Sequence, residues 1–395
     1  MFSGTRLSRV LWALLVVGVA LALDLVQRPA VPEPAQALTT GDPAIDVSRL
    51  QRVAQGDIPM PEGARAAHAS SLLVMPPTQA AALTVFWFSG ERESGPLVQI
   101  AASQLDRSTH TWSAPRVVAN RHVLGVQLGY GVRRLGNPVA WLDAQGRMHL
   151  FVVATGWGGW AASRVLHLQQ SSPQHTLESL AFEPVGVLPL SWLWNTSHLV
   201  RNAPLPLADG GMVLPVHFEL GLKYPVVLRM DAQGHFMGMQ RVSARTHLLQ
   251  PTLLAQSPQQ WLALMRDERP HGKVGAAVTS DGGRHWNDLP DLALDNPDAS
   301  VGGTAMASGQ LLLVHNSSLG SRARLDLSHS RDGQHWSLLA TLANGAPLDE
   351  FSYPALAWAD GSLWISYTVD RERLAWQQFA PPGDAAQKKM QGKTP

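Results

Sequence analysis

The groups in this sequence that can transfer protons lie beside segments in which apolar and polar residues alternate, the pattern of β-strands. Glu219 follows one such segment and is either a site carboxylate or a solvated charge at a strand end. Glu350 lies three residues before Tyr353. His68 can act as a general base or simply hydrogen-bond its own strand. The 15 histidines show no His-Glu-x-x-His or comparable spacing and there is no Cys, so we predict no metal site, no cofactor and no thiolate nucleophile.

Tryptophan is the second residue type with a chemical use here, because its 14 copies outnumber the 9 Phe and 4 Tyr. Trp157 belongs to one Trp-rich run, and Trp192 and Trp194 belong to another. Both runs are interpreted as long loops between strands. Exposed indoles in such loops would stack on sugar rings, whereas buried ones would close one end of the domain. We favour sugar contact and take Trp157 as a substrate-binding candidate.

A framework of many short strands must position these residues. The chain has 395 residues, 45% of them apolar, with 34 Gly and 28 Pro, which favours turns over long helices. An alternating apolar strand after a turn recurs six times, at Leu83, Met148, Met212, Trp261, Leu311 and Leu363. The steps between these positions are 65, 64, 49, 50 and 52 residues. Six units of about four strands that close into a ring leave few exposed sheet edges, so the sequence predicts an all-β, six-bladed β-propeller. A β-sandwich with coincidental hairpin spacing is the alternative.

Two Asp-Gly turns are separated by the length of the local repeat. Thr279 to Trp286 and Ser330 to Trp336 each join an Asp, a Gly and a Trp, and the two Trp residues are 50 positions apart. The Asp can accept hydrogen bonds from its own turn, the Gly can take a positive φ, and the Trp can bury against the sheet. We therefore interpret both turns as structural rather than as Ca²⁺ loops, which need more oxygen ligands. Ser103 to Trp112 is a weaker third copy without the Gly.

These turns resemble the Asp boxes of the sialidase (neuraminidase) superfamily, and the resemblance to its BNR-repeat, neuraminidase-like branch covers about residues 67–379. Further stretches that resemble the family are His68–Leu72, Trp87–Glu93, Arg201–Pro204, Gln250–Leu253, Leu264–Arg266 and Glu350–Pro354. The resemblance implies a six-bladed sialidase-like propeller with its site on the central face where the inner strands start.

The same resemblance implies roles for individual residues. Sialidases hold the substrate carboxylate with three arginines and use a Tyr nucleophile, because a neutral phenol is not repelled by an anionic sugar. Tyr353 resembles that nucleophile and Arg266 resembles the second arginine. Arg322 or Arg324 resembles the third. Further substrate-binding candidates are Arg92, Asn202 and Gln250.

Three departures bear on catalysis. Gln250 stands where the family has the Glu that activates the tyrosine, and an amide cannot take a proton from a phenol. His68 stands where the family has the Arg-Ile-Pro motif of the first blade, and Leu97 stands where relatives show an Asp acid/base. Glu219, Glu350 and His68 could replace these functions, so they join Tyr353 as catalytic candidates.

Two functions follow. The first is an exported, exo-acting glycoside hydrolase or lyase of an acidic sugar, with atypical catalytic residues. The second is a catalytically inactive propeller that binds polysaccharide during envelope or exopolysaccharide biogenesis. Either way the partner is a carbohydrate. Nucleic acid is excluded, because 31 Lys and Arg against 30 Asp and Glu give a net charge of +1.

The N-terminus predicts export. Arg6 and Arg9 precede an apolar run from Val10 to Leu23, which is typical of a signal peptide or a retained membrane anchor, and we favour the anchor. We divide the chain into residues 1–26 as the signal or anchor, 27–63 as a Pro- and Ala-rich linker, 64–380 as the propeller and 381–395 as a disordered tail. The expected location is the periplasm, with the N-terminal helix in the inner membrane.

Overall fold

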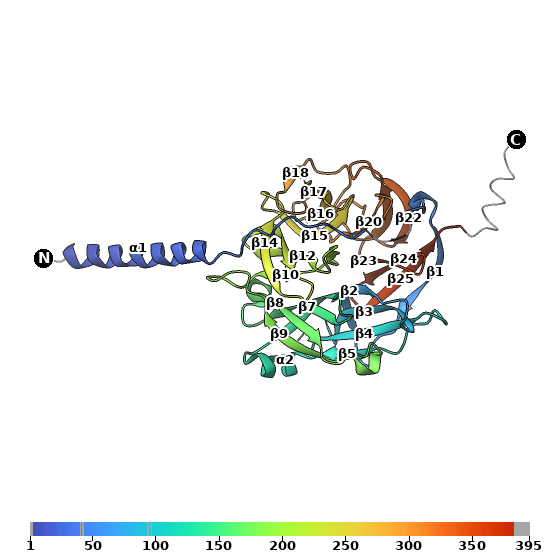
Figure 1. Cartoon of the computed structure of the whole chain (residues 1–395), viewed down its shortest axis with the longest axis horizontal. Coiled ribbons are helices and arrows are strands. Elements are labelled where there is room, and N and C mark those ends of the chain that lie inside the picture. The colour runs from blue at the N-terminus through green and yellow to red at the C-terminus, as the bar shows by residue number, and fades with distance from the viewer. Residues whose placement is uncertain (1–2, 40, 42, 93–94, 96, 383–395) are drawn as a thin grey trace.

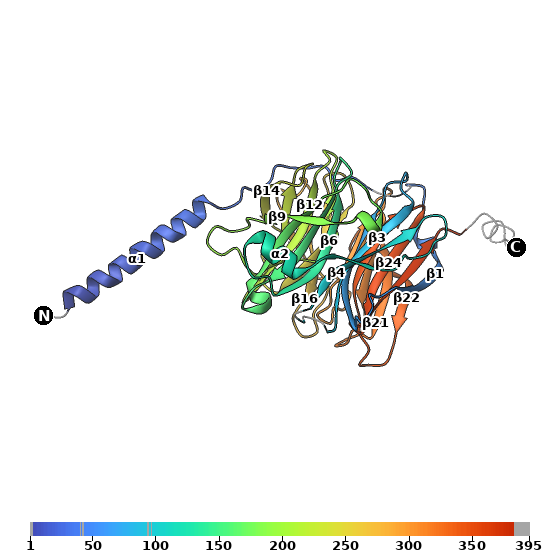
Figure 2. The ribbon, with the colours of Figure 1, turned by 90° about the horizontal axis from the view of Figure 1, so that it is seen from below.

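The computed structural model describes residues 3–39, 41, 43–92, 95 and 97–382. In this part of the chain, six antiparallel sheets surround a central axis, and the helix α1 (Ser3–Val26) projects from the edge of the ring (Figures 1 and 2). The predicted six-bladed β-propeller with an N-terminal apolar helix is confirmed. Residues 383–395 of the expected tail lie outside the described residues.

The blades follow one another along the chain, and each runs from an inner strand at the axis to an outer strand. Blade 1 contains β2 (Ala66–Val74), β3 (Ala81–Gly90), β4 (Gln99–Asp106) and β5 (Arg116–Ala119). Blade 2 contains β6 (Arg134–Leu142), β7 (Met148–Thr155), β8 (Ser163–Gln170) and β9 (Phe182–Val187). Blade 3 contains β10 (His198–Val200), β11 (Leu205–Pro206), β12 (Met212–Leu220), β13 (Leu222–Met230) and β14 (Phe236–Arg241).

The second half repeats the plan. Blade 4 contains β15 (Leu248–Ala255), β16 (Trp261–Asp267), β17 (Gly275–Thr279) and β18 (Asn287–Leu289). Blade 5 contains β19 (Gly302–Ala305), β20 (Leu311–Asn316), β21 (Arg324–Ser330) and β22 (Ser337–Asn344). Blade 6 contains β23 (Phe351–Ala359), β24 (Ser362–Val369), β25 (Arg373–Ala380) and, as its outer strand, β1 (Gln51–Ile58). The short helix α2 (Arg121–Leu128) connects blades 1 and 2.

The N-terminal strand closes the ring. β1 pairs antiparallel with β25, so the first strand of the chain completes the last blade. The segment before it lies along the propeller, since the N–H groups of Ala35 and Ala37 donate to the carbonyls of Gly282 and Pro258. The Pro- and Ala-rich segment 27–63 thus contains a propeller strand and several backbone contacts with blades 3 and 4.

The recurring strand seen in the sequence is the second strand of every blade. Leu83, Met148, Met212, Trp261, Leu311 and Leu363 lie in β3, β7, β12, β16, β20 and β24, and each is 0% exposed. The second strand lies inside its sheet, and adjacent blades cover both faces of that sheet. Its residues are therefore apolar, which explains why the repeat is strong in the sequence. Full burial of such side chains contributes about 1.5–3 kcal/mol each.

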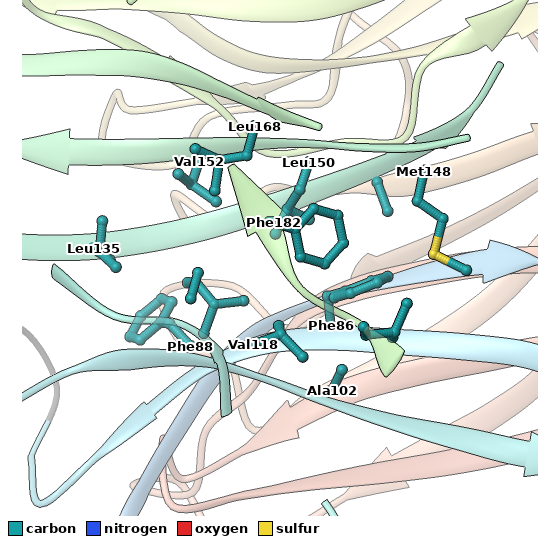
Figure 3. Packing of buried hydrophobic residues seen from close by; sticks show 14 of the residues in the cluster. Phe86, Phe88, Ala102, Val118, Leu135, Met148, Leu150, Val152, Leu168 and Phe182 are labelled. Carbon is teal, nitrogen blue, oxygen red and sulfur yellow. The ribbon is translucent and has the colours of Figure 1, made fainter. Parts of the chain in front are cut away.

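Apolar side chains between adjacent blades form the core. Figure 3 shows the largest cluster, in which Phe86 and Phe88 of β3 approach Leu150 of β7 and Phe182 of β9. The rings of Phe86 and Phe182 meet edge to face with 5.9 Å between their centroids. Such contacts fix the angle between blades and hold the inner strands around the axis.

The two Asp-Gly turns have equivalent structures. Asp281 accepts from the backbone N–H of His285 (2.9 Å) and contacts the ring of the same residue. Asp332 accepts from the N–H of His335 (2.8 Å) in the same way. Trp286 and Trp336 each donate to a turn glycine at 3.1 Å, but both indoles are half-buried rather than fully buried, because each lies beside an outer strand with one side toward solvent. Both turns connect third and fourth strands, so they lie on the propeller face opposite to the starts of the inner strands.

Candidate functional site

Several inner strands carry a β-bulge near their first residues. The register shifts between His68 and Ser71 in β2, and comparable shifts occur in β6, β15 and β23. The bulge residue has a positive φ: 50° at Gln250 and 54° at Tyr353. Non-glycine residues rarely adopt this conformation, and bulges often re-aim a side chain beside a functional site. Gln250 and Tyr353 thus occupy equivalent positions in blades 4 and 6.

The phenol of Tyr353 lies among polar groups from other blades. The Gln250 amide donates from Nε2 to the phenol oxygen at 3.2 Å. The guanidinium of Arg201 lies over the phenol ring, with its carbon 4.8 Å from the centroid. The ring of His68 is tilted against that of Tyr353, with 4.1 Å between centroids. Three blades besides that of Tyr353 therefore supply its surroundings.

Arg201 is a buried cation against the face of the Tyr353 ring. It is 2% exposed and donates to the backbone carbonyls of Ser70 (3.3 Å) and Pro354 (3.0 Å). Burial lowers its pKa to about 10, against the opposing effect of Tyr353, so the side chain is charged at neutral pH. Arg201 joins three inner strands and brings positive charge close to the phenol.

Arg266 connects the phenol to a carboxylate. Its Nε donates to Asp298 at 2.6 Å and its Nη1 donates to the Gln250 side-chain oxygen at 3.3 Å. Burial acts to lower its pKa, but Tyr353 and Asp298 outweigh burial and raise it. Asn202 donates to the Gln250 backbone carbonyl at 2.9 Å and so positions the bulge.

Arg322 extends the cluster toward blade 6. It donates to Glu350 at 3.0 Å and to the Asp298 backbone carbonyl at 2.5 Å. Glu350 also accepts from Arg371 at 2.9 Å and from Ser352 at 2.7 Å. Burial opposes ionisation of Glu350, but the bonds from Arg371 and Ser352 and the charge of Arg322 lower its pKa to about 2. Glu350 is therefore a counter-ion of two arginines.

His68 and Glu219 complete the surroundings. Burial and then the charge of Arg371 hold the pKa of His68 well below its usual range, so this imidazole is neutral. Its Nδ1 is buried and makes no hydrogen bond to any described residue. Glu219 lies 3.3 Å from His217, and although burial opposes ionisation, His217, Lys223 and Arg266 lower its pKa. Glu219 is an ionised carboxylate at the Arg266 side of the cluster.

These contacts join residues from every blade except blade 2 into one group, which we term the central cluster. Its members are His68, Arg201, His217, Glu219, Gln250, Arg266, Asp298, Arg322, Glu350, Tyr353 and Arg371. The sequence-predicted candidates Tyr353, Gln250, Arg266 and Arg322 lie together in it, as do His68, Glu219 and Glu350. Asn202 lies directly behind Gln250.

Three of the predicted site residues lie outside the central cluster. Arg324 pairs with Asp326 at 2.9 Å and donates to Thr341 of β22, so it lies toward the outer strand of its blade. Trp157 is 84% exposed on the β7–β8 loop, where Arg133 stacks over its ring at 3.8 Å. Arg92 is exposed in the β3–β4 loop, and no hydrogen bond or ion pair links it to the central cluster within the described part of the chain.

Sequence reasoning missed Arg201, His217, Asp298 and Arg371. Arg201 lies in a stretch that resembles the family, so a signal for it existed. Asp298 and Arg371 have positive φ values of 50° and 60° in loops without a motif, and nothing in the sequence pointed to them. Among the described residues, no group of three or more His, Asp or Glu has metal-binding geometry.

The central cluster is suited to hold an anion. Arg201, Arg266, Arg322 and Arg371 face the carboxylates of Glu219, Asp298 and Glu350, which leaves an excess of one positive charge. Guanidinium groups bind carboxylates through paired, planar hydrogen bonds. The phenol accepts from an amide and has no carboxylate or imidazole hydrogen-bonded to it among the described residues.

A cavity lies at the end of the axis opposite to the central cluster. It measures about 290 Å³ and is lined by all six inner strands, among them Leu72, Trp141 and Leu356. Its lining contains no acidic or basic side chain among the described residues.

Comparisons with known proteins agree with this architecture. The BNR repeat-like domain matches residues 81–365, which is more than half of the chain. No curated protein sequence matches. Among solved structures, a Hadza microbial sialidase, Hz136, is similar with a TM-score of 0.64 and 16% identity over 81% of this chain and 66% of its own.

Two further structures support the fold. Trypanosoma rangeli sialidase is similar with a TM-score of 0.63 and 12% identity over 88% of this chain and 60% of its own. A protein of unknown function from Dyadobacter fermentans is similar with a TM-score of 0.65 and 10% identity over 85% of this chain and 100% of its own. The chain spans less than two thirds of the length of the two sialidases. The chain belongs to the BNR repeat-like domain family and has the six-bladed propeller fold of sialidases.

Proposed function

We propose that the central cluster binds an acidic sugar of a glycan and that recognition, rather than hydrolysis, is its main function. The observation that carries this proposal is the contact between Gln250 and Tyr353 within a ring of arginines. The sugar carboxylate would take the place of part of the internal ion pairing at Arg266 and Arg322. The solved T. rangeli sialidase with sialic acid supports an acidic sugar as the ligand class.

The same contact argues against efficient hydrolysis. A phenol becomes a nucleophile when a base removes its proton, and an amide cannot do so. His68 is neutral, but its ring is tilted against the phenol ring and no described hydrogen bond joins the two side chains. Leu97, 50% exposed in the β3–β4 loop, cannot act as an acid/base.

An exo-acting glycosidase is the second candidate. The observation that favours it is the phenol itself: Tyr353 lies at a bulge, next to two arginines, where an anionic sugar would be held. The ionised Glu219 near Arg266 could then act as a general base on a water molecule. Loss of all glycan turnover in Tyr353→Phe would favour this candidate.

The proposal includes export and anchoring. The stretch Ser8–Val26 of α1 is long and apolar enough to cross a membrane, and it is not buried by the propeller. An exported protein with this helix retained would be held at the outer surface of the inner membrane and meet envelope glycans there.

Binding assays on the full-length chain in nanodiscs test the glycan proposal. Sialyllactose and an oligogalacturonate are acidic probes, and lactose is the neutral control. Loss of a charged hydrogen bond predicts binding about 10- to 100-fold weaker in Arg322→Ala and Arg266→Ala. Affinity should fall as salt rises.

Arg324→Ala is the matched control, because Arg324 lies two residues from Arg322 but faces the outer strand. It should leave affinity unchanged. Equal affinity for acidic and neutral probes, or equal losses in Arg322→Ala and Arg324→Ala, would contradict the proposal.

A further inference from the structure

An exposed apolar patch lies on the edge of blade 3. Trp192, Leu193 and Trp194, in the loop before β10, are 52%, 50% and 55% exposed. Leu220 and Leu222, which flank the β12–β13 turn, are 39% and 62% exposed. We term these five residues the blade 3 rim. Contiguous apolar groups of this kind mark a site of contact with a partner.

The C-terminal end of α1 lies beside this rim. A cavity of about 750 Å³ is lined on one side by Asp24, Arg28 and Val31, and on the other by Trp192 and Trp194. Figures 1 and 2 both show α1 leaving the propeller close to β14. The apolar helix and the apolar rim are therefore neighbours.

The connection between the helix and the propeller is short. α1 ends at Val26, and the carbonyl of Ala30 accepts from the N–H of Met239 in β14 at 2.9 Å. Four residues span at most about 14 Å. A bilayer crossed by α1 would therefore keep the edge of blade 3 at the level of the lipid headgroups.

The chemistry of this edge fits that environment. Trp side chains gather where hydrocarbon meets water, because their rings are apolar and their N–H groups bind polar partners. Arg28 and Arg241 both line the cavity, and Arg241 lies 4.5 Å from the ring of Tyr224. These cations would attract anionic headgroups.

We infer that the blade 3 rim inserts into the interface of the bilayer that α1 crosses, and that this second contact orients the propeller. The inference rests on the anchoring part of the proposed function and is independent of glycan binding. The rim loops belong to the face where the inner strands start, which is also the face that carries the central cluster.

Single-cysteine labelling tests this inference, because the chain has no Cys. Full-length Leu193→Cys is labelled with the fluorophore NBD in nanodiscs of phosphatidylcholine and phosphatidylglycerol. Leu348→Cys is the matched control, because Leu348 is 97% exposed in the β22–β23 loop on the same face but on a different blade. Lipids with a spin label in the upper acyl chain serve as the quencher.

The label at position 193 should show a blue-shifted emission and loss of fluorescence with the quenching lipid, and the label at 348 should show neither. Trp192→Ser with Trp194→Ser, or Arg28→Gln with Arg241→Gln, should reduce the quenching at position 193. Equal quenching at 193 and 348 would overturn the inference. Mature protein that lacks residues 1–26, seen by mass spectrometry, would overturn it as well. A label at 193 that responds to added glycan but not to lipid would assign the loop to sugar binding instead.

Discussion

Gln250→Glu would give Tyr353 the base that its surroundings lack. The substitution keeps the length of the side chain and replaces the Nε2 donor, 3.2 Å from the phenol oxygen, with a carboxylate oxygen. Gln250 is 4% exposed, so the new charge would be buried. Arg266, 3.3 Å from the present side-chain oxygen, would pair with the carboxylate and keep it ionised at neutral pH.

The expected gain follows from general-base catalysis. A positioned base contributes about 10²–10⁴-fold to a rate. That factor corresponds to about 2.7–5.4 kcal/mol of transition-state stabilisation. We expect Gln250→Glu to release 4-methylumbelliferone from its sialoside faster than the unchanged protein by a factor in this range. The aryl leaving group needs little acid assistance, so Leu97 should not mask the effect.

The assay needs two controls. Gln250→Ala removes the amide without adding a base and should not gain activity. Gln250→Glu combined with Tyr353→Phe should lose the gain. The Gln250→Glu protein could unfold at the same temperature as the unsubstituted protein and bind sialyllactose, yet release no product. That result would refute the assignment of Tyr353 as a latent nucleophile. A gain that survives Tyr353→Phe would refute it too.

Two further outcomes concern stability. Asp281→Ala should lower the free energy of unfolding by about 1–2 kcal/mol, because the turn loses acceptors for the His285 N–H and for the Thr279 hydroxyl. Glycan affinity should stay unchanged. Loss of affinity in a titration assay at constant stability in a thermal assay would contradict a structural role. The pKa of Glu350 is lowered from 4.5 to about 2, so its ion pairs stabilise the protein above about pH 4.5 and this contribution is lost as pH falls through about 2. Unfolding followed by circular dichroism should show a weaker acid dependence in Glu350→Gln, and equal dependence in both proteins would contradict this.

The strands that the sequence predicted best are those with apolar neighbours on both sides. The second strands of the six blades are recognisable in the sequence as apolar runs, because residues in them such as Leu83 and Trp261 are completely buried. β1 gave no such signal. Seven of its eight residues, Gln51 to Asp57, are not buried, because it is an outer strand with one free edge. Its assignment depends on β25, more than 300 residues away, and no local pattern contains that information.

The residues of the central cluster also differ in how far the sequence predicts them. Tyr353, Gln250, Arg266 and Arg322 could be proposed from the sequence because short motifs surround them. Arg322 could be distinguished from Arg324 only in the structure, since β21 begins at Arg324 while Arg322 lies in the loop before it, and the two side chains have different partners. The roles of Asp298 and Arg371 come from loops that fold against other blades, so their positions depend on the closed ring rather than on neighbouring residues.

The way in which the ring closes has a consequence for biogenesis. Because β1 is the first strand to be synthesised and pairs with β25, it must wait until nearly the whole chain has been made. Until then β1 has no partner strand, and unpaired strand edges promote association between chains. A chain shortened from its C-terminus by one strand would leave β1 without its partner and open the last blade. Folding of the last blade therefore requires both ends of the chain. Premature termination before residue 380 should yield aggregation or proteolysis rather than a smaller folded domain.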